Sequence, residues 1–280
     1  MVKINILVLG STGLLGKYLY TKFKLQNECD VYEYSRNNNG NLTENLLISL
    51  IKKHKINFII NCIAQTNVNY CEENYQVAYN DNVLTTKIIV SALNKLISDV
   101  KLIHISTDHF YNNIEASNES SKIFLLNNYA KTKYESEMIS LSYKKSVILR
   151  TNFFYDHNHK GFHKFIYDAT FNNETIYLYD NIYISPLYIG TLFNVILLIC
   201  NNFKSGIFNI GSSNFISKYD YGIKLVNHLK LKNTNIVKIE YDNFNNKVKR
   251  PLNMSMTSKK FINCYKYILP EFEDDLLKSL

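Results

Sequence analysis

Two residues in the segment NNYAKTKYESE (127–137) have side chains that could perform acid–base chemistry together. Tyr129 carries a phenol and Lys133 an amine, and a spacing of four residues places both on one face of a helix. A phenol with an ordinary pKa of about 10 is a weak acid at neutral pH, and a nearby ammonium lowers that pKa because it stabilises the phenolate. Tyr and Lys are abundant in this chain, however, so the pair alone also fits a solvated helix surface. The surrounding sequence decides between these interpretations.

A glycine-rich turn, GSTGLLG (10–16), lies between the apolar run KINILVL (3–9) and a segment in which Leu19 and Phe23 recur at helical spacing. Between a strand and a helix, such glycines allow a tight turn and a close approach of the backbone to a pyrophosphate. The spacing GxxGxxG is that of short-chain dehydrogenases and their extended relatives. We therefore expect the turn to bind a dinucleotide through Gly10, Thr12, Gly13, Leu14, Leu15 and Gly16.

The end of the second predicted strand, VYEYS (31–35), indicates which dinucleotide is bound. An NAD site usually has an acidic residue there for the ribose 2′-hydroxyl. Here Ser35 and Arg36 follow instead, and the nearest carboxylate, Glu33, alternates to another face. Lysine is the common cation of this chain, so an arginine marks a position where a planar, bidentate donor is useful. The pattern favours NADP(H), and an exposed surface arginine is the alternative.

A third chemical group follows the predicted strand 100–106, in the segment HISTD (104–108). Open α/β sheets bind their ligands at the carboxyl ends of their strands. There the hydroxyl of Thr107 can donate to a substrate carbonyl while Tyr129 supplies a proton. An isolated Tyr/Lys pair would predict neither this segment nor the glycine turn, so we predict a catalytic group of Thr107, Tyr129 and Lys133.

The elements that position these residues alternate between strand and helix through the first half of the chain. Besides the segments above, we predict helices near 44–54 and 75–97 and strands at 57–63 and 146–150. Beyond residue 150 we predict helices near 162–172, 189–202 and 218–231, and strands near 176–179, 207–210 and 236–240. The fold class is therefore α/β, a Rossmann-type doubly wound parallel sheet with a smaller C-terminal substrate-binding lobe. We assign residues 1–153 to the NADP-binding domain, with 184–216 also packing on it, and 154–280 mainly to the lobe.

The bulk composition argues against several classes of function. The net charge of +8 comes from lysines spread along the chain, without basic runs, and it suits anionic small substrates better than nucleic acid. Five scattered cysteines form neither a metal-binding cluster nor a disulfide framework. The apolar stretch 182–200 contains Pro186 and polar residues, which suits a loop and a buried helix better than a membrane span. MVKINILVLG has too short an apolar run for a signal peptide. We expect a cytoplasmic protein without nucleic-acid, membrane or metal partners.

Along nearly its whole length the chain resembles the dTDP-4-dehydrorhamnose reductases, which are extended short-chain dehydrogenase/reductases acting on 4-keto-6-deoxy sugar nucleotides. The resembling blocks are GSTGLLG, NCIAQTNVNYCEE (61–73), AYNDN (78–82), STDHF (106–110), YAKTK (129–133), RTNFFY (150–155), ISPLY (184–188), GIFNIGSS (206–213) and RPLNMSM (250–256). The resemblance implies NADPH-dependent reduction of a sugar C4 carbonyl in deoxysugar and surface-polysaccharide biosynthesis.

The resemblance also assigns residues to the two sides of the reaction. It makes Thr107, Tyr129 and Lys133 the catalytic triad. It places cofactor contacts at Cys62, Ala64, Thr66, Asn82 and Ser106, in addition to the glycine turn, Ser35 and Arg36. Tyr129 and Lys133 are also expected to contact the cofactor, with Lys133 holding the nicotinamide ribose. It places sugar-nucleotide contacts at Asp108, His109, Phe153 and Arg250.

This chain departs from the family mainly on the sugar-facing side. His109 stands where the family commonly has Tyr, Phe153 where it has Trp, and Leu187 where it has Thr; Asn41 and Asn69 replace aspartates. The identity of the sugar and nucleotide therefore stays open. Two alternatives also stay open: a non-catalytic NADP-binding regulatory subunit, and a sugar-nucleotide epimerase/reductase. The presence of Tyr129 and Lys133 favours an enzyme, and a homodimer is compatible with all of these readings.

Overall fold

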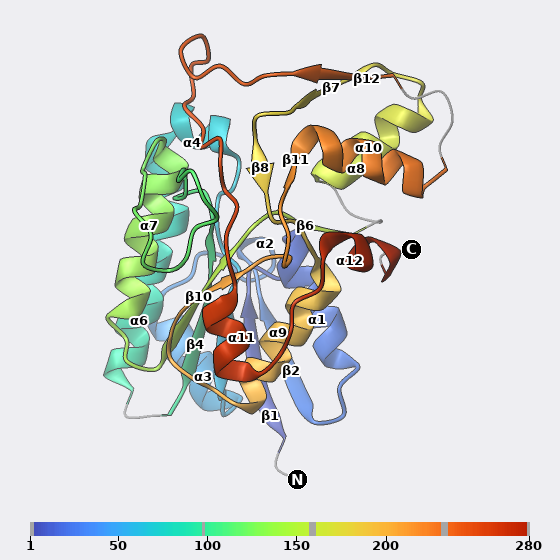
Figure 1. The fold of residues 1–280 in the computed structure, drawn as a ribbon. Coiled ribbons are helices and arrows are strands. Elements are labelled where there is room, and N and C mark those ends of the chain that lie inside the picture. Colours follow the sequence, from blue (N-terminus) through green and yellow to red (C-terminus); the bar gives the residue numbers. More distant parts are fainter. Residues whose placement is uncertain (1–2, 97–98, 157–160, 231–234, 279–280) are drawn as a thin grey trace. The chain divides into compact units, whose positions relative to one another are not determined.

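The computed structural model of the chain describes residues 3–96, 99–156, 161–230 and 235–278 (Figure 1). The chain divides into two compact units, each built from discontinuous segments. Unit 1 comprises Met1–Thr107, Asn127–Arg150 and Ile196–Ile207, and unit 2 comprises Asp108–Leu126, Thr151–Val195 and Phe208–Leu280. The domain bounds expected from the sequence, 1–153 with 184–216 also packing on that domain and 154–280 mainly as the lobe, stay a prediction. Both units are discontinuous, because the chain leaves unit 1 after Thr107 and returns to it at Asn127.

The central sheet has six strands in the order β10-β5-β4-β3-β1-β2. The β1–β2, β1–β3 and β3–β4 pairs are parallel, and the order reverses at β1, as in a doubly wound sheet. The strands are β1 (Ile4–Leu9), β2 (Cys29–Tyr34), β3 (Phe58–Asn61), β4 (Lys101–Thr107), β5 (Ser146–Thr151) and β10 (Gly206–Ile210). Their apolar, largely buried residues are what a sheet covered on both faces requires. The predicted fold class is confirmed.

Helices cover this sheet, with α6 and α7 side by side in Figure 1. Buried residues of α3 and α6, among them Leu47, Ile51, Ile89 and Leu93, form one core with Leu7, Ile59 and Leu102 of the strands. The first-half helices are α1 (Leu14–Lys24), α2 (Arg36–Asn39), α3 (Glu44–Lys53), α4 (Val68–Glu73), α5 (Tyr75–Tyr79), α6 (Thr85–Lys95) and α7 (Asn128–Leu141).

The long helix predicted at 75–97 is interrupted by a π-helical turn, η1 (Asn80–Leu84), between α5 and α6. Asn82, in this turn, is buried, and its side chain donates to Thr132 Oγ1 at 2.9 Å and accepts from Gln65 N at 2.8 Å. Periodicity alone does not reveal a single wide turn, which depends on such long-range contacts. π-Turns of this kind are frequent at functional sites.

Unit 2 is built from short strand pairs and helices around its own aromatic core. Tyr155, Ile166, Leu178, Tyr221 and Phe272 are central members of that core. Its elements are β6 (Phe154–Tyr155), β7 (Ile176–Tyr179), β8 (Tyr183–Ile184), β9 (Leu187–Tyr188), β11 (Ile216–Ser217), β12 (Ile236–Ile239), α8 (Phe162–Phe171), α10 (Lys218–His228), α11 (Lys259–Tyr265) and α12 (Phe272–Lys278). Helix α9 (Ile189–Asn201) carries the chain from unit 2 back to unit 1.

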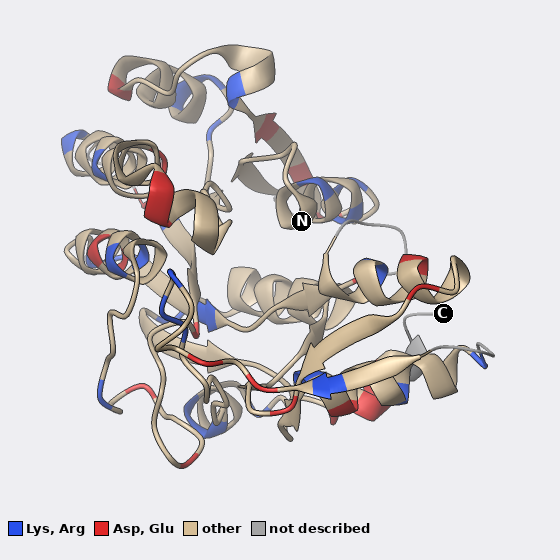
Figure 2. Ribbon diagram, turned by 90° about the horizontal axis from the view of Figure 1, so that it is seen from above, with Lys and Arg blue, Asp and Glu red and all other residues tan. Residues whose placement is uncertain are grey.

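Among the described residues of unit 2, β6–β9 and β7–β12 pair in parallel and β8–β11 pair antiparallel. In Figure 2, Lys and Arg are interspersed with Asp and Glu over many helices and loops. No helix among the described residues is both long and apolar enough to cross a membrane.

Candidate active site

The three predicted catalytic residues all belong to unit 1. Thr107 is the last residue of β4, and Tyr129 and Lys133 lie on α7, which packs against β4. All three are buried. Helix α7 begins where the side chain of Asn127 accepts a hydrogen bond from Ala130 N at 2.9 Å, and this cap fixes the first turn that carries Tyr129.

The ring of Tyr129 is positioned by α4 and α5, through packing with Cys71 and Ala78. The carboxylate of Glu72, also on α4, accepts from Asn128 N at 2.8 Å. Cys71 and Glu72, from the block 61–73, therefore contact the first turn of α7. A solvated helix surface is excluded for Tyr129 and Lys133.

Lys133 is held by a main-chain acceptor on β4. Its Nζ donates to the carbonyl oxygen of Ile105 at 2.7 Å. Burial lowers the pKa of Lys133 to about 8, although the negative charge of Glu137, one helical turn on, acts in the opposite direction. The amine is thus fixed in place and loses its proton more readily than an exposed lysine does.

Glu137 is part of a buried charge network beneath α7. Arg150 of β5 donates from Nε to both carboxylate oxygens of Glu137 at 3.1 Å and from Nη2 to Oε1 at 2.5 Å. Ser106 Oγ donates to the same carboxylate at 2.7 Å. The planar, bidentate donor expected of a rare arginine is therefore used inside the protein, to tie α7 to β4 and β5.

A second buried chain of polar side chains supports the main chain at Lys133. Asn61 Nδ2 lies 3.1 Å from Nδ1 of His104, whose Nε2 lies 3.2 Å from Ser136 Oγ. Ser136 Oγ in turn donates to the carbonyl oxygen of Lys133 at 2.9 Å. Burial, with a smaller contribution from the Lys133 charge, holds the pKa of His104 well below its ordinary value. His104 is therefore a neutral link between β3 and α7.

The glycine turn has the shape of an anion cradle. Gly10 has φ of +84°, which L side chains rarely adopt, and a Cβ at Gly16 would lie only 2.2 Å from the carbonyl oxygen of Gly10. A Cβ added at Gly13 would lie 3.4 Å from the carbonyl oxygen of Gly10, an ordinary van der Waals contact, and Gly13 lines a cavity. Ser11 Oγ is buried and has no hydrogen-bond partner among the residues that the structure describes. Glycines that line a cavity, an unused hydroxyl and the start of α1 together fit a pyrophosphate.

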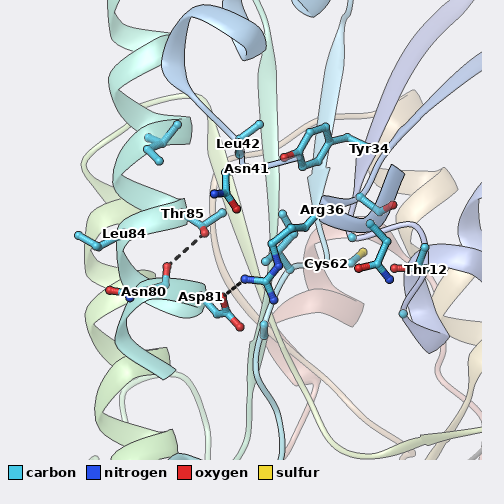
Figure 3. Close-up of a pocket in the computed structure, with 17 residues that line it drawn as sticks. Thr12, Tyr34, Arg36, Asn41, Leu42, Cys62, Asn80, Asp81, Leu84 and Thr85 are labelled. Atoms are coloured by element: carbon cyan, nitrogen blue, oxygen red, sulfur yellow. Dashed lines mark hydrogen bonds and ion pairs between the residues drawn. The ribbon is translucent and has the colours of Figure 1, made fainter. Parts of the chain in front are cut away.

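A cavity of about 510 Å³ opens beside this turn, within unit 1 (Figure 3). Its walls come from the glycine turn, the segment after β2, the segment after β3 and the helix η1–α6. It is lined by Gly10, Thr12, Gly13, Tyr34, Ser35, Arg36, Asn37, Asn41, Leu42, Cys62, Ile63, Ala64, Asn80, Asp81, Leu84, Thr85 and Ile88. Seven predicted cofactor residues line this cavity: Gly10, Thr12, Gly13, Ser35, Arg36, Cys62 and Ala64.

The remaining predicted cofactor residues lie elsewhere. Leu14, Leu15 and Gly16 form the first turn of α1, and Thr66 is exposed. The side chains of Asn82 and Ser106 are engaged internally, with Gln65 and Thr132 and with Glu137 respectively. Asn82 therefore fixes the loop after β3. Burial raises the pKa of Cys62, in the cavity wall, to about 12, so its thiol stays protonated.

Sequence reasoning missed Asp81, which lines the same cavity. Its Oδ1 lies 2.8 Å from Nη1 of Arg36 (Figure 3). The end of β2 has no acidic residue, but η1, which comes much later in the chain, places the carboxylate of Asp81 beside it. No local motif marks this pairing, because it depends on the sheet bringing the segments after β2 and β3 beside the helix.

The predicted sugar-nucleotide residues belong to unit 2. Asn152 Nδ2 donates to Oδ2 of Asp108, and Asp108 N donates to Thr151 O at 3.0 Å. His109 is buried, and its pKa is lowered to about 3 by burial and then by the charges of Arg250 and Lys218.

Lys218, a second residue that the sequence did not reveal, shares this environment. Burial of its ammonium and the charge of Arg250 lower the pKa of Lys218 to about 8, whereas Asp108 raises it. Two cations thus act on one buried histidine, and this is an arrangement that favours an anionic ligand.

Phe153, also predicted to contact the sugar nucleotide, takes part in aromatic packing. Its ring contacts those of Phe162 and Tyr221 edge to face, and the ring centroids are 5.6 and 5.2 Å from that of Phe153.

In the described part of the chain, no group of three or more His, Cys, Asp or Glu side chains is arranged to hold a metal ion.

Two curated proteins similar to this chain are a sugar-nucleotide reductase and a polysaccharide biosynthesis protein. A dTDP-4-dehydrorhamnose reductase of Aggregatibacter actinomycetemcomitans is 25% identical over 230 residues, which cover 79% of this chain and 78% of that protein. The spore coat polysaccharide biosynthesis protein SpsK of Bacillus subtilis is 23% identical over 250 residues, covering 88% and 87% of the two chains.

Among solved structures, the dTDP-4-dehydrorhamnose reductase of Bacillus anthracis, in complex with NADP, superimposes with a TM-score of 0.90 at 21% identity, covering 99% of this chain and 98% of that one. This likeness shows the fold. The model of the family described as RmlD substrate binding domain matches residues 4–280. The resemblance that the motifs predicted is therefore confirmed, and the chain belongs to the RmlD substrate binding domain family.

Proposed function

We propose that this protein is a reductase that uses NADPH to reduce the C4 carbonyl of a 4-keto-6-deoxy sugar nucleotide. The observation that carries the proposal is the placement of Lys133, which is buried, fastened to β4 and one helical turn from Tyr129. Burying the ammonium of a lysine costs free energy, so a lysine at this position would not be expected if α7 served only to stabilise the fold. The names of the relatives, sugar-nucleotide reductases and a polysaccharide biosynthesis protein, support the same activity.

The proposed cofactor fits unit 1. The glycine turn would hold the pyrophosphate through its open backbone and Ser11 Oγ, and the cavity beside it would take the adenosine half near Ser35 and Arg36. The NADP complex of the Bacillus anthracis relative supports this cofactor. When bound, NADPH supplies a hydride to the substrate carbonyl.

The chain's own residues handle the oxygen of that carbonyl. Thr107 donates a hydrogen bond to the oxygen, and Tyr129 transfers its phenolic proton to the oxygen as negative charge develops there. Lys133, as the ammonium, stabilises the phenolate left on Tyr129. The carbonyl of Ile105 holds the ammonium in position throughout. Arg250 and Lys218 of unit 2 bind the diphosphate of the substrate.

A substrate panel tests this function directly. The purified protein is mixed with NADPH and dTDP-, UDP- or GDP-linked 4-keto-6-deoxy sugars, and oxidation of NADPH is followed by its absorbance. We expect oxidation with at least one sugar nucleotide and none with Lys133→Met, while Lys131→Met, an exposed neighbour on α7, keeps the parent rate. Binding of NADPH without oxidation by any member of the panel would instead support the non-catalytic regulatory subunit.

A further inference from the structure

Arg36 and Asp81 form an ion pair at the adenosine end of the cavity in unit 1. Arg36 Nη1 lies 2.8 Å from Asp81 Oδ1, and the two side chains are 65% and 14% exposed. Figure 3 shows the guanidinium extended from the segment after β2 toward η1. Among the described residues that line the cavity, these two are the charged ones. The charges of this pair therefore determine whether this end of the cavity attracts or repels an anion.

The main chain at Arg36 is fixed, although its side chain is exposed. Ser35 Oγ accepts from Asn38 N at 3.3 Å, and Ser35 N donates to Asn39 Oδ1 at 3.1 Å. The hydroxyl of Tyr34 donates to Gly40 O at 2.5 Å and closes the turn. Because the turn is rigid, Arg36 can change partners only by moving its long side chain, which needs little free energy at an exposed position.

Asp81 is held more firmly than Arg36. It lies in the π-helical turn η1, next to Asn82, whose side chain is anchored to Gln65 and Thr132. A mostly buried carboxylate on an anchored turn keeps its place when the guanidinium moves. It therefore competes with any phosphate that approaches Arg36, both by holding the same N–H donors and by direct repulsion.

We propose that Asp81 is a specificity-determining residue, which occupies Arg36 until the 2′-phosphate of NADPH displaces it from the guanidinium. This inference rests on the proposed cofactor function. NADH has a hydroxyl at that position and leaves the ion pair intact. Consequently Asp81 lowers the affinity for NADPH but not for NADH. The ratio of the two affinities is therefore smaller than it would be if Arg36 had no carboxylate partner.

Dissociation constants of NADPH and NADH, measured by titration calorimetry for the parent and its variants, test the proposal. We expect Asp81→Asn to tighten NADPH binding about threefold to fivefold, the scale of an exposed charge interaction, and to change NADH binding less than twofold. In an Arg36→Ala background the same substitution should lose most of this gain, because no guanidinium remains to be released. Asp30→Asn, which removes a carboxylate from the exposed pair with Lys3, controls for the change in net charge.

The outcomes separate this inference from the function on which it rests. If the parent binds neither NADPH nor NADH, the proposed cofactor function fails. If the parent binds NADPH but Asp81→Asn leaves its affinity unchanged or weakens it, the role of Asp81 is wrong while the cofactor function stands. An equal gain in the Asp81→Asn and Asp30→Asn variants also overturns the proposal, since it would reflect net charge alone. Adenosine 2′,5′-bisphosphate and AMP, titrated in the same way, should reproduce the difference without the nicotinamide half.

Discussion

Lys133 Nζ donates to the carbonyl oxygen of Ile105 at 2.7 Å, so an amine on α7 is fixed to β4 two residues before Thr107. Because the pKa of Lys133 is lowered to about 8, the ammonium is present below that pH and lost above it. We predict that kcat/KM falls as the pH rises through about 8. A pH–rate profile checks this prediction, and Lys131→Met should keep the same falling limb. A profile that stays flat up to pH about 10, where an ordinary lysine titrates, would contradict the role of Lys133.

Removing the phenolic hydroxyl should stop proton transfer without disturbing the cofactor cavity, which Tyr129 does not line. We expect Tyr129→Phe to bind NADPH normally and to lower kcat by about two orders of magnitude or more, the scale of a lost general acid. Tyr134→Phe, on the same helix, is the matched control and should retain the parent kcat. Parent-like turnover in Tyr129→Phe would show that another group supplies the proton.

The buried pair of Glu137 and Arg150 predicts a large effect on stability. Glu137→Gln leaves the guanidinium of Arg150 buried without its counter-ion, and it should lower the free energy of unfolding by about 3–5 kcal/mol. Glu44→Gln, which breaks the more exposed pair with Lys95, should cost about 1 kcal/mol or less. Urea denaturation followed by circular dichroism measures both values. Equal, small losses in the two variants would mean that the buried pair contributes no more than a surface pair.

Arg250 is predicted to bind the diphosphate of the substrate through its planar guanidinium. Arg250→Lys keeps the charge but loses the bidentate geometry, so the KM for the sugar nucleotide should rise about tenfold with kcat nearly unchanged. The dissociation constant of NADPH should not move. Lys249→Met, at the exposed neighbouring position, is the control. An unchanged KM in Arg250→Lys would place the diphosphate elsewhere.

The environment of His109 bears on whether the protein also epimerises its substrate. Burial and two neighbouring cations lower the pKa of His109 to about 3, so it is a poor base for removing a carbon-bound proton. We predict simple reduction, with no exchange at C3 or C5. Running the reaction in D₂O and examining the product by NMR tests this. Enzyme-dependent deuterium at either carbon would make His109 or Asp108 a catalytic base.

The sequence predicted the parts of this protein that depend on local pattern. Continuous apolar runs marked strands of the central sheet, and the segment around Tyr129 and Lys133 was predicted to be helical, as α7 is. Features that depend on long-range contacts were not predictable in this way. Asp81 meets Arg36 only because the sheet brings their segments together, and the two-residue strands β6 and β9 exist only as a pair. The pairing of Arg150 with Glu137 was not predictable from local pattern either, since an acidic residue on a polar helix usually faces water.

The order β10-β5-β4 has a consequence for how this chain is made. Strand β5 ends at Thr151, but β10, which covers its outer edge, begins only at Gly206. During synthesis, more than fifty further residues must therefore be translated before β10 exists. Until then, the backbone N–H and C=O groups on the outer edge of β5 have no strand to pair with. An open, apolar sheet edge is the kind of surface that pairs with other nascent chains. Synthesis of this protein in quantity should therefore benefit from slow translation or from chaperones that shield strand edges until β10 has emerged.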